Sequence, residues 1–353
     1  MHILVNDFIG GVLDRGIPLY VRNLVDGLRE EGFRVSVVRA PALCRALPRN
    51  LFYMLAVLVE QTALPLIGFL LRADLTLYPY NSVAVVDLLT GRGRIVVHDL
   101  EQLNRRLSFS KLYYLACYRA LKRRNAPIFA ISELTRQRLL ESGLFGRGTI
   151  TLLPNTFYAF EQLLTAQPRR RDEGRSILLC TGSTANKDLE GLVAGYLPPL
   201  LAAGFRVTVV GLHKAADAPR LASLHDFIAA GQLHLCERLS DREVARQYRA
   251  HAIAWVHSLR EGFGRCVVEG RLAGCRVLCT DIPEFAALRD GDVHVYRNAA
   301  GFMPLLERTA ALPLPTGAYS GYPYRALLRA AIECGFAAPN SSLSGGSKRI
   351  TPA

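Results

Sequence analysis

Ser258-Leu-Arg-Glu-Gly-Phe-Gly-Arg-Cys-Val-Val-Glu-Gly-Arg-Leu-Ala-Gly274 is the stretch from which the fold of this chain is best inferred. It follows the apolar run Ile253 to His257, passes through a glycine-containing turn and continues as a helical pattern. Gly262 and Gly264 allow the backbone to approach a ligand closely, and the free N–H groups at the helix start offer an anion site for a diphosphate. A strand, a glycine turn and a helix in this order indicate a parallel α/β fold.

Two acidic residues accompany this turn. Glu261 lies before it, and Glu269 lies about one helical turn inside the helix. We expect Glu269 to face the same cleft and to accept hydrogen bonds from ribose hydroxyls, as acidic groups do in other nucleotide folds. The alternative is a glycine-turned helix start with two solvent-facing acids.

A second loop of the same kind is Cys180-Thr-Gly-Ser-Thr-Ala-Asn-Lys-Asp-Leu189, again between a strand and a helix. The ammonium group of Lys187 is a candidate partner for a diphosphate. The alternative is a solvated lysine in the first helical turn, since lysines are mostly exposed.

Short β-rich apolar runs alternate with longer helical patterns along the whole chain, which predicts βαβ units and mainly parallel sheets. The pattern occurs twice, so the fold class is α/β with two Rossmann-like domains. The predicted strands are 2–5, 34–38, 74–77, 95–97, 128–131, 149–153, 176–181, 206–210, 233–236, 253–257, 276–280 and 293–296.

The length of 353 residues also suggests two domains. A polar interval from Tyr158 to Arg175 is suited to an interdomain connection. The predicted domains are residues 1–167 and 168–336, the second ending with a helix from Tyr324 to Cys334. Residues 337–353 contain little to bury and are predicted to be a disordered tail.

Composition limits the classes of protein that fit this chain. Met1 to Val5 show no export signal, and the eight cysteines form no CxxC pair, so we expect buried thiols in the cytoplasm. Leu51 to Leu71 is interrupted by polar residues and by Pro65, which predicts one or two packed helices instead of a membrane span. The net charge of +13 permits an anionic partner.

Several segments together resemble glycosyltransferase family 4, the large retaining family of GT-B fold, and in particular its bacterial mannosyltransferase-like members. Glu261 and Glu269 match the family's Glu-x7-Glu motif, Glu261-Gly-Phe-Gly264 its "EGFG" segment, and Asp281-Ile-Pro283 its "SDIP" segment. Val97-His-Asp-Leu100 is similar to the "HDL" of the mannosyltransferase-like members. The resemblance implies two Rossmann-like domains whose parallel sheets face across an interdomain cleft.

The resemblance also implies roles for individual residues. Glu261, His98 and Lys187 are the catalytic candidates, with Glu261 on the transferred sugar, His98 on a sugar hydroxyl and Lys187 on the diphosphate. Ser183 stands where the family often has an arginine, so one positive charge is missing. Arg265, Gly270, Arg271 and Arg276 also depart from the commoner family residues. The donor-binding candidates are Glu269, Gly262, Phe263, Gly264, Arg265, Lys187, Ser183 and Gly182.

The amino-terminal half contributes a candidate acceptor side. Asn6-Asp-Phe-Ile-Gly-Gly11 resembles the family's first glycine loop, in which Gly10 and Gly11 would direct backbone amides at the cleft, and Asp99 follows a strand end beside His98. The alternatives are a plain strand-to-helix turn and a structural histidine.

Between Arg105 and Arg124 there are seven basic residues, no acidic ones and several aromatic rings. Such a helix can rest on an anionic membrane surface, although a solvated basic helix explains the pattern as well. Nucleic acid is not expected, because the chain lacks zinc-finger spacing, an RNP-like strand and basic-zipper heptads.

The sequence therefore predicts a retaining, metal-independent hexosyltransferase without a cofactor, peripheral at the inner membrane face. It would move a hexose, with a mannose-like sugar favoured, from a nucleotide-diphosphate sugar to a saccharide or lipid-linked acceptor. The alternatives are an epimerase or hydrolase of the same fold and a non-catalytic nucleotide-sugar or membrane-binding module.

Overall fold

The computed structural model describes residues 1–12, 16–100, 109–145, 150–168, 175–212, 214–316, 319 and 321–336. The expected disordered tail, 337–353, and the start of the basic segment, 105–108, lie outside the described residues. Contacts divide the chain into two units, one comprising Met1–Thr156 with Tyr324–Ala353 and the other Phe157–Pro323.

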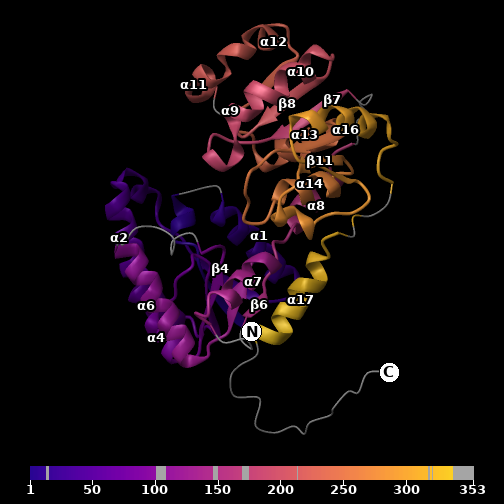
Figure 1. The fold of residues 1–353 in the computed structure, drawn as a ribbon. Coiled ribbons are helices and arrows are strands. Elements are labelled where there is room, and N and C mark those ends of the chain that lie inside the picture. Colours follow the sequence, from indigo (N-terminus) through magenta and orange to yellow (C-terminus); the bar gives the residue numbers. More distant parts are fainter. Residues whose placement is uncertain are drawn as a thin grey trace, which may run out of the picture. The chain divides into compact units, whose positions relative to one another are not determined.

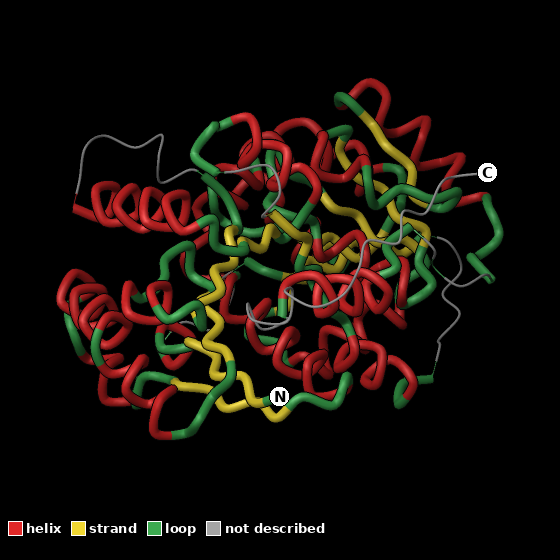
Figure 2. The backbone as a smooth tube through the Cα atoms, turned by 90° about the horizontal axis from the view of Figure 1, so that it is seen from below, coloured by secondary structure: helices red, strands yellow, loops and turns green. Residues whose placement is uncertain are grey.

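The first unit is a parallel sheet with helices packed against it (Figures 1 and 2). Its strand order is β2-β1-β3-β4-β5-β6. The strands are β1 (His2–Asn6), β2 (Arg34–Val38), β3 (Leu75–Tyr78), β4 (Gly93–Val97), β5 (Ile128–Ala130) and β6 (Ile150–Leu152). The helices are η1 (Ile9–Gly11), α1 (Ile17–Glu30), η2 (Ala42–Ala46), α2 (Arg49–Gln61), α3 (Ala63–Leu70), α4 (Val85–Leu89), α6 (Phe109–Arg124), α7 (Glu133–Glu141) and α17 (Tyr324–Gly335).

The second unit repeats the arrangement with strand order β12-β11-β10-β7-β8-β9, again all parallel. The strands are β7 (Ser176–Cys180), β8 (Arg206–Val210), β9 (Leu233–Cys236), β10 (Ile253–Val256), β11 (Arg276–Thr280) and β12 (Val293–Tyr296). The helices are α8 (Tyr158–Thr165), η4 (Ala185–Lys187), α9 (Leu189–Gly191), η5 (Leu192–Tyr196), α10 (Leu197–Ala202), α11 (Lys214–Asp217), η6 (Ala218–Leu224), α12 (His225–Ala229), α13 (Asp241–Ala250), α14 (Arg265–Leu272), α15 (Pro283–Ala286) and α16 (Ala299–Ala311).

All twelve predicted strands are present, and the two-sheet α/β prediction is confirmed. The central strands β1, β4, β7 and β11 are buried at every residue, as expected for parallel strands covered by helices on both faces. Read from β9 to β12, the second sheet has the order 3-2-1-4-5-6 of the Rossmann fold, which reverses between β7 and β10. Ligands of such sheets bind outside the carboxyl ends of the strands at this reversal.

The units do not divide where the sequence predicts. The prediction places the boundary between residues 167 and 168, whereas the contacts place it between Thr156 and Phe157. The boundary lies earlier because α8 packs on α13 of the second unit. The ring centres of Phe160 and Tyr248 are 5.7 Å apart in this contact.

The last helix also differs from the predicted domain assignment. It forms where the sequence predicts, but α17 belongs to the first unit and packs beside β6 (Figure 1). The carbonyl of Gly335 accepts a hydrogen bond from Arg94 Nε (2.9 Å), and Phe336 stacks on Phe129 at 5.2 Å. The chain therefore enters the second unit and returns to the first.

The apolar stretch near residue 60 forms two helices, as predicted. Within it, Arg49–Leu70 is long and apolar enough to cross a membrane by length and composition alone, with 33% of its most apolar window buried. Thr62, with φ −121° and ψ −64°, separates α2 from α3.

Candidate functional site

The two loops singled out in the sequence meet in the second unit at the β7–β10 reversal. Leu259 N donates to the carbonyl of Asn186 (2.8 Å), and Asn186 Nδ2 donates to the carbonyl of Arg260 (3.1 Å). These bonds join the loop after β7 to the loop after β10, which brings their charged side chains together.

Lys187 and Glu261 form an ion pair between these loops. Ser258 Oγ also donates to Glu261 Oε1 (2.7 Å), and both partners of the ion pair are mostly buried. Burial is the largest single effect and lowers the pKa of Lys187, but the Glu261 carboxylate together with the Cys266 and Cys180 thiols raises it more, so the net pKa lies above its ordinary value. Lys187 is therefore a fixed, charged ammonium group and not a solvated lysine.

The residue after Lys187 helps to hold this loop. Asp188 adopts a left-handed conformation with φ +45°, and its Oδ1 accepts from Gly191 N (3.2 Å). Its Oδ2 lies 3.4 Å from Nε2 of the buried His257. Asp188 thus connects the Lys187 loop to the end of the central strand β10.

Helix α14 begins at this ion pair. Its N-cap residue Gly264 has φ +91°, and no side chain caps the first-turn N–H groups. A Cβ at Gly264 would lie 2.5 Å from the Phe285 ring, so glycine is required by both conformation and space. The helix start combines N–H donors with the positive end of the helix dipole, which suits an anion.

Glu269 is held on both carboxylate oxygens. Tyr248 OH donates to Oε2 (3.2 Å), and Arg265 donates to Oε1 (3.0 Å) from the preceding helical turn. The Arg265 guanidinium also lies 4.4 Å from the Phe157 ring centre. Glu269 and Arg265 lie in the sequence motif, whereas Tyr248 lies outside it because its side chain reaches the site from α13.

Two thiols lie beside these groups. Cys180 Sγ is 3.2 Å from Tyr248 OH. The thiol of Cys180 also forms a hydrogen bond with the thiol of Cys266, and this bond lowers the pKa of Cys266. All eight cysteines are free thiols, six of them buried, as the sequence predicts; Cys266 is partly exposed and Cys334 is exposed. Among the described residues, no group of three or more His, Cys, Asp and Glu side chains is arranged to hold a metal ion.

The glycine loop after β7 contains Gly182 and Ser183. Ser183 Oγ donates to Asp217 Oδ2 (2.8 Å), and the Ser183 carbonyl accepts from Arg220 NH1 (3.1 Å). The loop therefore has a guanidinium beside it, although Arg220 also pairs with Asp217 and Glu190. The sequence does not identify Arg220, because it comes from a different segment, η6.

Phe263 is a packing residue in this structure. It is buried, with ring centres 4.7 Å from Tyr322 and 6.4 Å from Phe157. This packing on Tyr322 and Phe157 holds the turn in place and so fixes the positions of Gly262 and Gly264.

Three of the four departures from the family pattern are also structural. Gly270 packs against Ala254, where a Cβ would lie 2.9 Å from the alanine Cβ. Arg271 forms ion pairs with Asp290 and Asp292, and Arg276 donates to carbonyls at the end of α16. Only Arg265 contacts a proposed site residue.

In the first unit, His98 directly follows β4 and is buried. One ring nitrogen donates to the Pro79 carbonyl; Nε2 has no partner among the described residues, so the donor is Nδ1. Burial lowers the pKa of His98 to about 4, so the ring is neutral near pH 7 and Nε2 is an acceptor.

The other acceptor-side candidates follow β1 and β4, which are separated in the sheet by β3. Gly10 and Gly11 line a cavity beyond β1, and Asp99 is partly exposed directly after His98. A Cβ at Gly10 would lie 2.1 Å from Asp7 Oδ1, and one at Gly11 would lie 2.2 Å from the carbonyl oxygen of Ala40. Both positions therefore require glycine for close packing.

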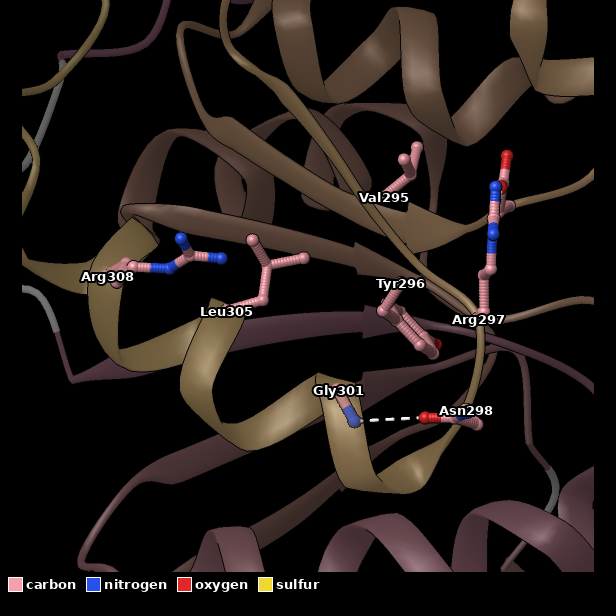
Figure 3. A pocket seen from close by; sticks show the side chains of 8 residues that line it. Val295, Tyr296, Arg297, Asn298, Gly301, Leu305 and Arg308 are labelled. Atoms are coloured by element: carbon pink, nitrogen blue, oxygen red, sulfur yellow. Dashed lines mark hydrogen bonds and ion pairs between the residues drawn. The ribbon is translucent and has the colours of Figure 1, made fainter.

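A cavity of about 450 Å³ in the second unit lies beside β12 and α16 (Figure 3). Arg297 and Arg308 line it together with Leu305 and Tyr296, and Gly301 N donates to Asn298 Oδ1 (3.0 Å) at the helix start. The lining does not include Lys187, Glu261 or Glu269. Asp281 of the Asp281-Ile-Pro283 segment does line it, paired with Arg289 (2.5 Å) and Arg297 (2.9 Å).

The chain is similar to known proteins in sequence over part of its length and in fold over nearly all of it. Residues 175–305 match the family model described as glycosyl transferases group 1, and this range contains both loops of the site. No curated protein sequence matches the chain.

Solved structures match nearly the whole chain. Sucrose-phosphate synthase from Thermosynechococcus elongatus is 16% identical, with 95% of this chain and 96% of that chain covered and a TM-score of 0.62. UDP-GlcNAc 2-epimerase from Methanocaldococcus jannaschii is 11% identical, with 94% and 99% covered and a TM-score of 0.59. Alr3699/HepE of Anabaena, solved with UDP and glucose, is 14% identical, with 88% and 89% covered and a TM-score of 0.58. At these identities the likeness establishes the fold, GT-B.

Proposed function

We propose that this chain moves a hexose from a nucleotide-diphosphate sugar to a saccharide or lipid-linked saccharide. The match of residues 175–305 to the group 1 glycosyl transferase family supports this proposal. A mannose-like sugar, retention of the anomeric configuration and a role in cell-surface polysaccharide or glycolipid synthesis are parts of this proposal.

One observation carries the proposal. The charged Lys187 and the uncapped start of α14 meet at the β7–β10 reversal, in contact with Glu261 and one helical turn from Glu269. A departing nucleoside diphosphate gains negative charge as the glycosidic bond breaks, and prepositioned donors stabilise that charge without reorganising. This source of positive charge supports a reaction that requires no metal ion.

The remaining roles follow from the same geometry. Glu261 lies beside the diphosphate position and would contact the transferred sugar, while Glu269 would accept hydrogen bonds from the ribose. In the first unit, the neutral His98 offers Nε2 to a sugar hydroxyl and cannot act as a general acid near pH 7, because its pKa is about 4.

The test of Glu269 follows directly. We expect Glu269→Ala to reduce release of the nucleoside diphosphate in the presence of acceptor by about 10- to 100-fold, since hydrogen bonds to a charged group contribute roughly 1.5–3 kcal/mol. Candidate nucleotide sugars with lipid-linked or oligosaccharide acceptors are the substrates. The matched control is Glu307→Ala, on the exposed side of α16. Unchanged turnover in Glu269→Ala would remove this residue from the mechanism.

Two rival functions share the fold. An epimerase or hydrolase, as the UDP-GlcNAc 2-epimerase match illustrates, would form product without an acceptor. A non-catalytic module would be stabilised thermally by a nucleoside diphosphate and transfer sugar to no acceptor. The transferase forms product only with an acceptor, the epimerase or hydrolase forms product without one, and the non-catalytic module forms no product but is stabilised by the nucleoside diphosphate.

We further propose that the first unit rests on the anionic inner face of the plasma membrane. Among the described residues, twelve of the fifteen exposed large hydrophobic side chains lie between Leu43 and Leu112. Helix α2 is apolar on both sides, with Phe52 and Ala56 buried and Leu51, Met54 and Leu58 exposed. Such a helix is normally covered, and an exposed apolar patch of this kind marks a membrane or protein contact.

Charge favours the membrane over a second copy of the chain. Helix α6 contains no acidic residue and ends with the exposed Lys122, Arg123 and Arg124. Its contact with α2 is direct, because Tyr113 OH donates to Glu60 Oε1 (2.6 Å). Basic side chains beside an apolar face suit anionic headgroups, whereas two copies of one basic surface would repel each other.

A membrane test uses vesicles with and without anionic phospholipid. We expect Leu51→Ser/Met54→Ser/Leu58→Ser to weaken vesicle binding about 100-fold, since each of these exposed side chains would contribute roughly 1 kcal/mol if the bilayer covered about half of it. The control Leu312→Ser removes an exposed leucine from the second unit. Sedimentation with vesicles measures binding. Full vesicle binding by the triple variant, or concentration-dependent dimerisation that it abolishes, would contradict a membrane role for this face.

A further inference from the structure

Tyr248 reaches the candidate donor site from α13, outside both loop motifs. Its hydroxyl donates to Oε2 of Glu269 (3.2 Å), and the residue is 1% exposed. We propose that Tyr248 is a positioning residue that orients the Glu269 carboxylate toward the two adjacent hydroxyl groups of the donor's ribose. This inference rests on the proposed transferase function.

The Tyr248 hydroxyl has two neighbours but only one proton to donate. Cys180 Sγ and Glu269 Oε2 both lie 3.2 Å from its oxygen. A carboxylate oxygen is a stronger acceptor than a thiol sulfur, which accepts hydrogen bonds only weakly. Burial raises the pKa of Tyr248 well above its ordinary value, so the hydroxyl keeps its proton. Tyr248 therefore donates to Glu269.

The Glu269 carboxylate is bound on each oxygen and still has capacity for a ligand. Among the described residues, Tyr248 donates to Oε2, and Arg265 donates to Oε1 (3.0 Å). Each oxygen of an ionised carboxylate can accept about two hydrogen bonds, so one acceptor site remains on each oxygen. The Glu269 side chain is 12% exposed. The two remaining sites match a pair of adjacent hydroxyl groups.

Tyr248 is itself fixed by its neighbours in the core of the second unit. The Phe160 ring meets the Tyr248 ring edge to face, and the Tyr248 carbonyl accepts from Cys275 Sγ (3.2 Å). A Cβ at Gly270, the residue after Glu269, would lie 3.8 Å from Tyr248 Cε1, so α14 passes directly beside the ring. Because Tyr248 is buried among these groups, it can act on a nucleotide only through Glu269.

Loss of the Tyr248 hydroxyl would release one end of the carboxylate. Arg265 would still hold Oε1, but Oε2 would no longer be fixed by a protein donor. The carboxylate would then have to be ordered when the ribose binds, and ordering a side chain on binding costs affinity. The expected effect is confined to ligands that have ribose hydroxyl groups.

The test therefore compares a nucleoside diphosphate with its 2′,3′-dideoxy counterpart, using the full chain and calorimetry. UDP, GDP and ADP are titrated first, and the one that binds the wild type most tightly is used in the comparison. We expect Tyr248→Phe to bind this ribonucleotide about fivefold more weakly than the wild type does, and the dideoxynucleotide with unchanged affinity. The substitution removes one oxygen atom and keeps the packed ring.

Tyr319→Phe is the matched control. It removes another hydroxyl group of the second unit, which donates to the Leu288 carbonyl (2.9 Å), and both affinities should equal those of the wild type. A double-mutant cycle shows whether Tyr248 acts through Glu269. Tyr248→Phe/Glu269→Ala should bind the ribonucleotide within about twofold of Glu269→Ala alone, because the partner of the hydroxyl is already gone.

The outcomes separate this inference from the proposed function. A loss in Tyr248→Phe that is confined to the ribonucleotide and absent without Glu269 supports the inference. Unchanged ribonucleotide affinity, equal weakening of both nucleotides, or an additive loss in the double variant overturns it. Equal binding of both nucleotides by the wild type also overturns it, but leaves a diphosphate site in place. A wild type that binds none of UDP, GDP and ADP contradicts the proposed function, and the inference fails with it.

Discussion

Lys187→Met is expected to lower kcat/KM for sugar transfer by about 100- to 1,000-fold, comparable to the loss of one prepositioned donor from an enzyme's anion site. Lys187 is mostly buried, and Glu261 keeps its pKa above the ordinary value, so it is charged at every pH at which the protein is assayed. Because the Lys187 side chain is mostly buried, its charge would act on the diphosphate more strongly than a fully solvated charge would.

The substitution also leaves the Glu261 carboxylate without its cation. Removing one partner of a buried ion pair typically costs several kcal/mol, so thermal unfolding must be measured alongside activity. Lys187→Arg keeps the charge and should retain part of the activity. Lys187→Met/Glu261→Gln removes both charges and should recover stability without recovering transfer. If that double variant transfers sugar at the wild-type rate, the diphosphate does not bind here.

The control for a general loss of positive charge is Arg242→Met, which alters an exposed residue of α13 in the same unit. We expect it to change kcat/KM less than twofold. Affinity for the nucleoside diphosphate, measured by thermal stabilisation, should fall with Lys187→Met and stay unchanged with Arg242→Met. This comparison distinguishes a bound diphosphate from a long-range field effect of the basic protein.

The strands were predictable because parallel strands buried on both faces appear as short, continuous apolar runs. Ser176–Cys180 and Arg276–Thr280 are examples, and every residue in them is buried. The domain assignment of α8 and α17 was not predictable in the same way. An amphipathic pattern indicates that a helix packs, but not on which sheet, and contacts such as Arg94 with Gly335 span distant parts of the sequence.

The candidate donor site was predictable where its residues directly follow strands. Lys187 and Glu261 are 74 positions apart, yet the loops that contain them follow adjacent parallel strands and therefore meet. Tyr248 and Arg220 were not identified, because their side chains reach the site from α13 and η6 and belong to no loop motif. Phe263 was predicted from the motif to bind the donor, but in the structure its ring packs against Tyr322.

Residues 175–305 match the group 1 glycosyl transferase family, and the solved structures show that the chain has the GT-B fold that the resemblance implies. The missing arginine at Ser183 has a structural counterpart in Arg220, which donates to the Ser183 carbonyl. Glu190 and Asp217 take up part of its charge, so it is not equivalent to an unpaired arginine. The proposed binding of the diphosphate therefore depends mainly on Lys187 and on the N–H groups at the start of α14.

Gly264→Ala is expected to destabilise the second unit by about 3 kcal/mol and to abolish transfer at the assay temperature. The φ of +91° would cost an L-residue roughly 1–2 kcal/mol, and the added methyl group meets the buried Phe285 ring at 2.5 Å, an overpacking that costs roughly 1–3 kcal/mol. For a unit of this size, the melting temperature should fall by about 6–12 °C.

Gly291→Ala is the matched control for this substitution. Gly291 lies in the same unit, a Cβ there would meet nothing within 4 Å, and its φ lies outside the left-handed region. Its melting temperature should therefore stay within about 2 °C of the wild type. Because the helix start that Gly264 forms is also the proposed anion site, nucleoside diphosphate should stabilise the folded Gly264→Ala protein less than it stabilises the control. A Gly264→Ala protein that melts and binds nucleotide like the control would show that the left-handed turn neither limits stability nor shapes the anion site.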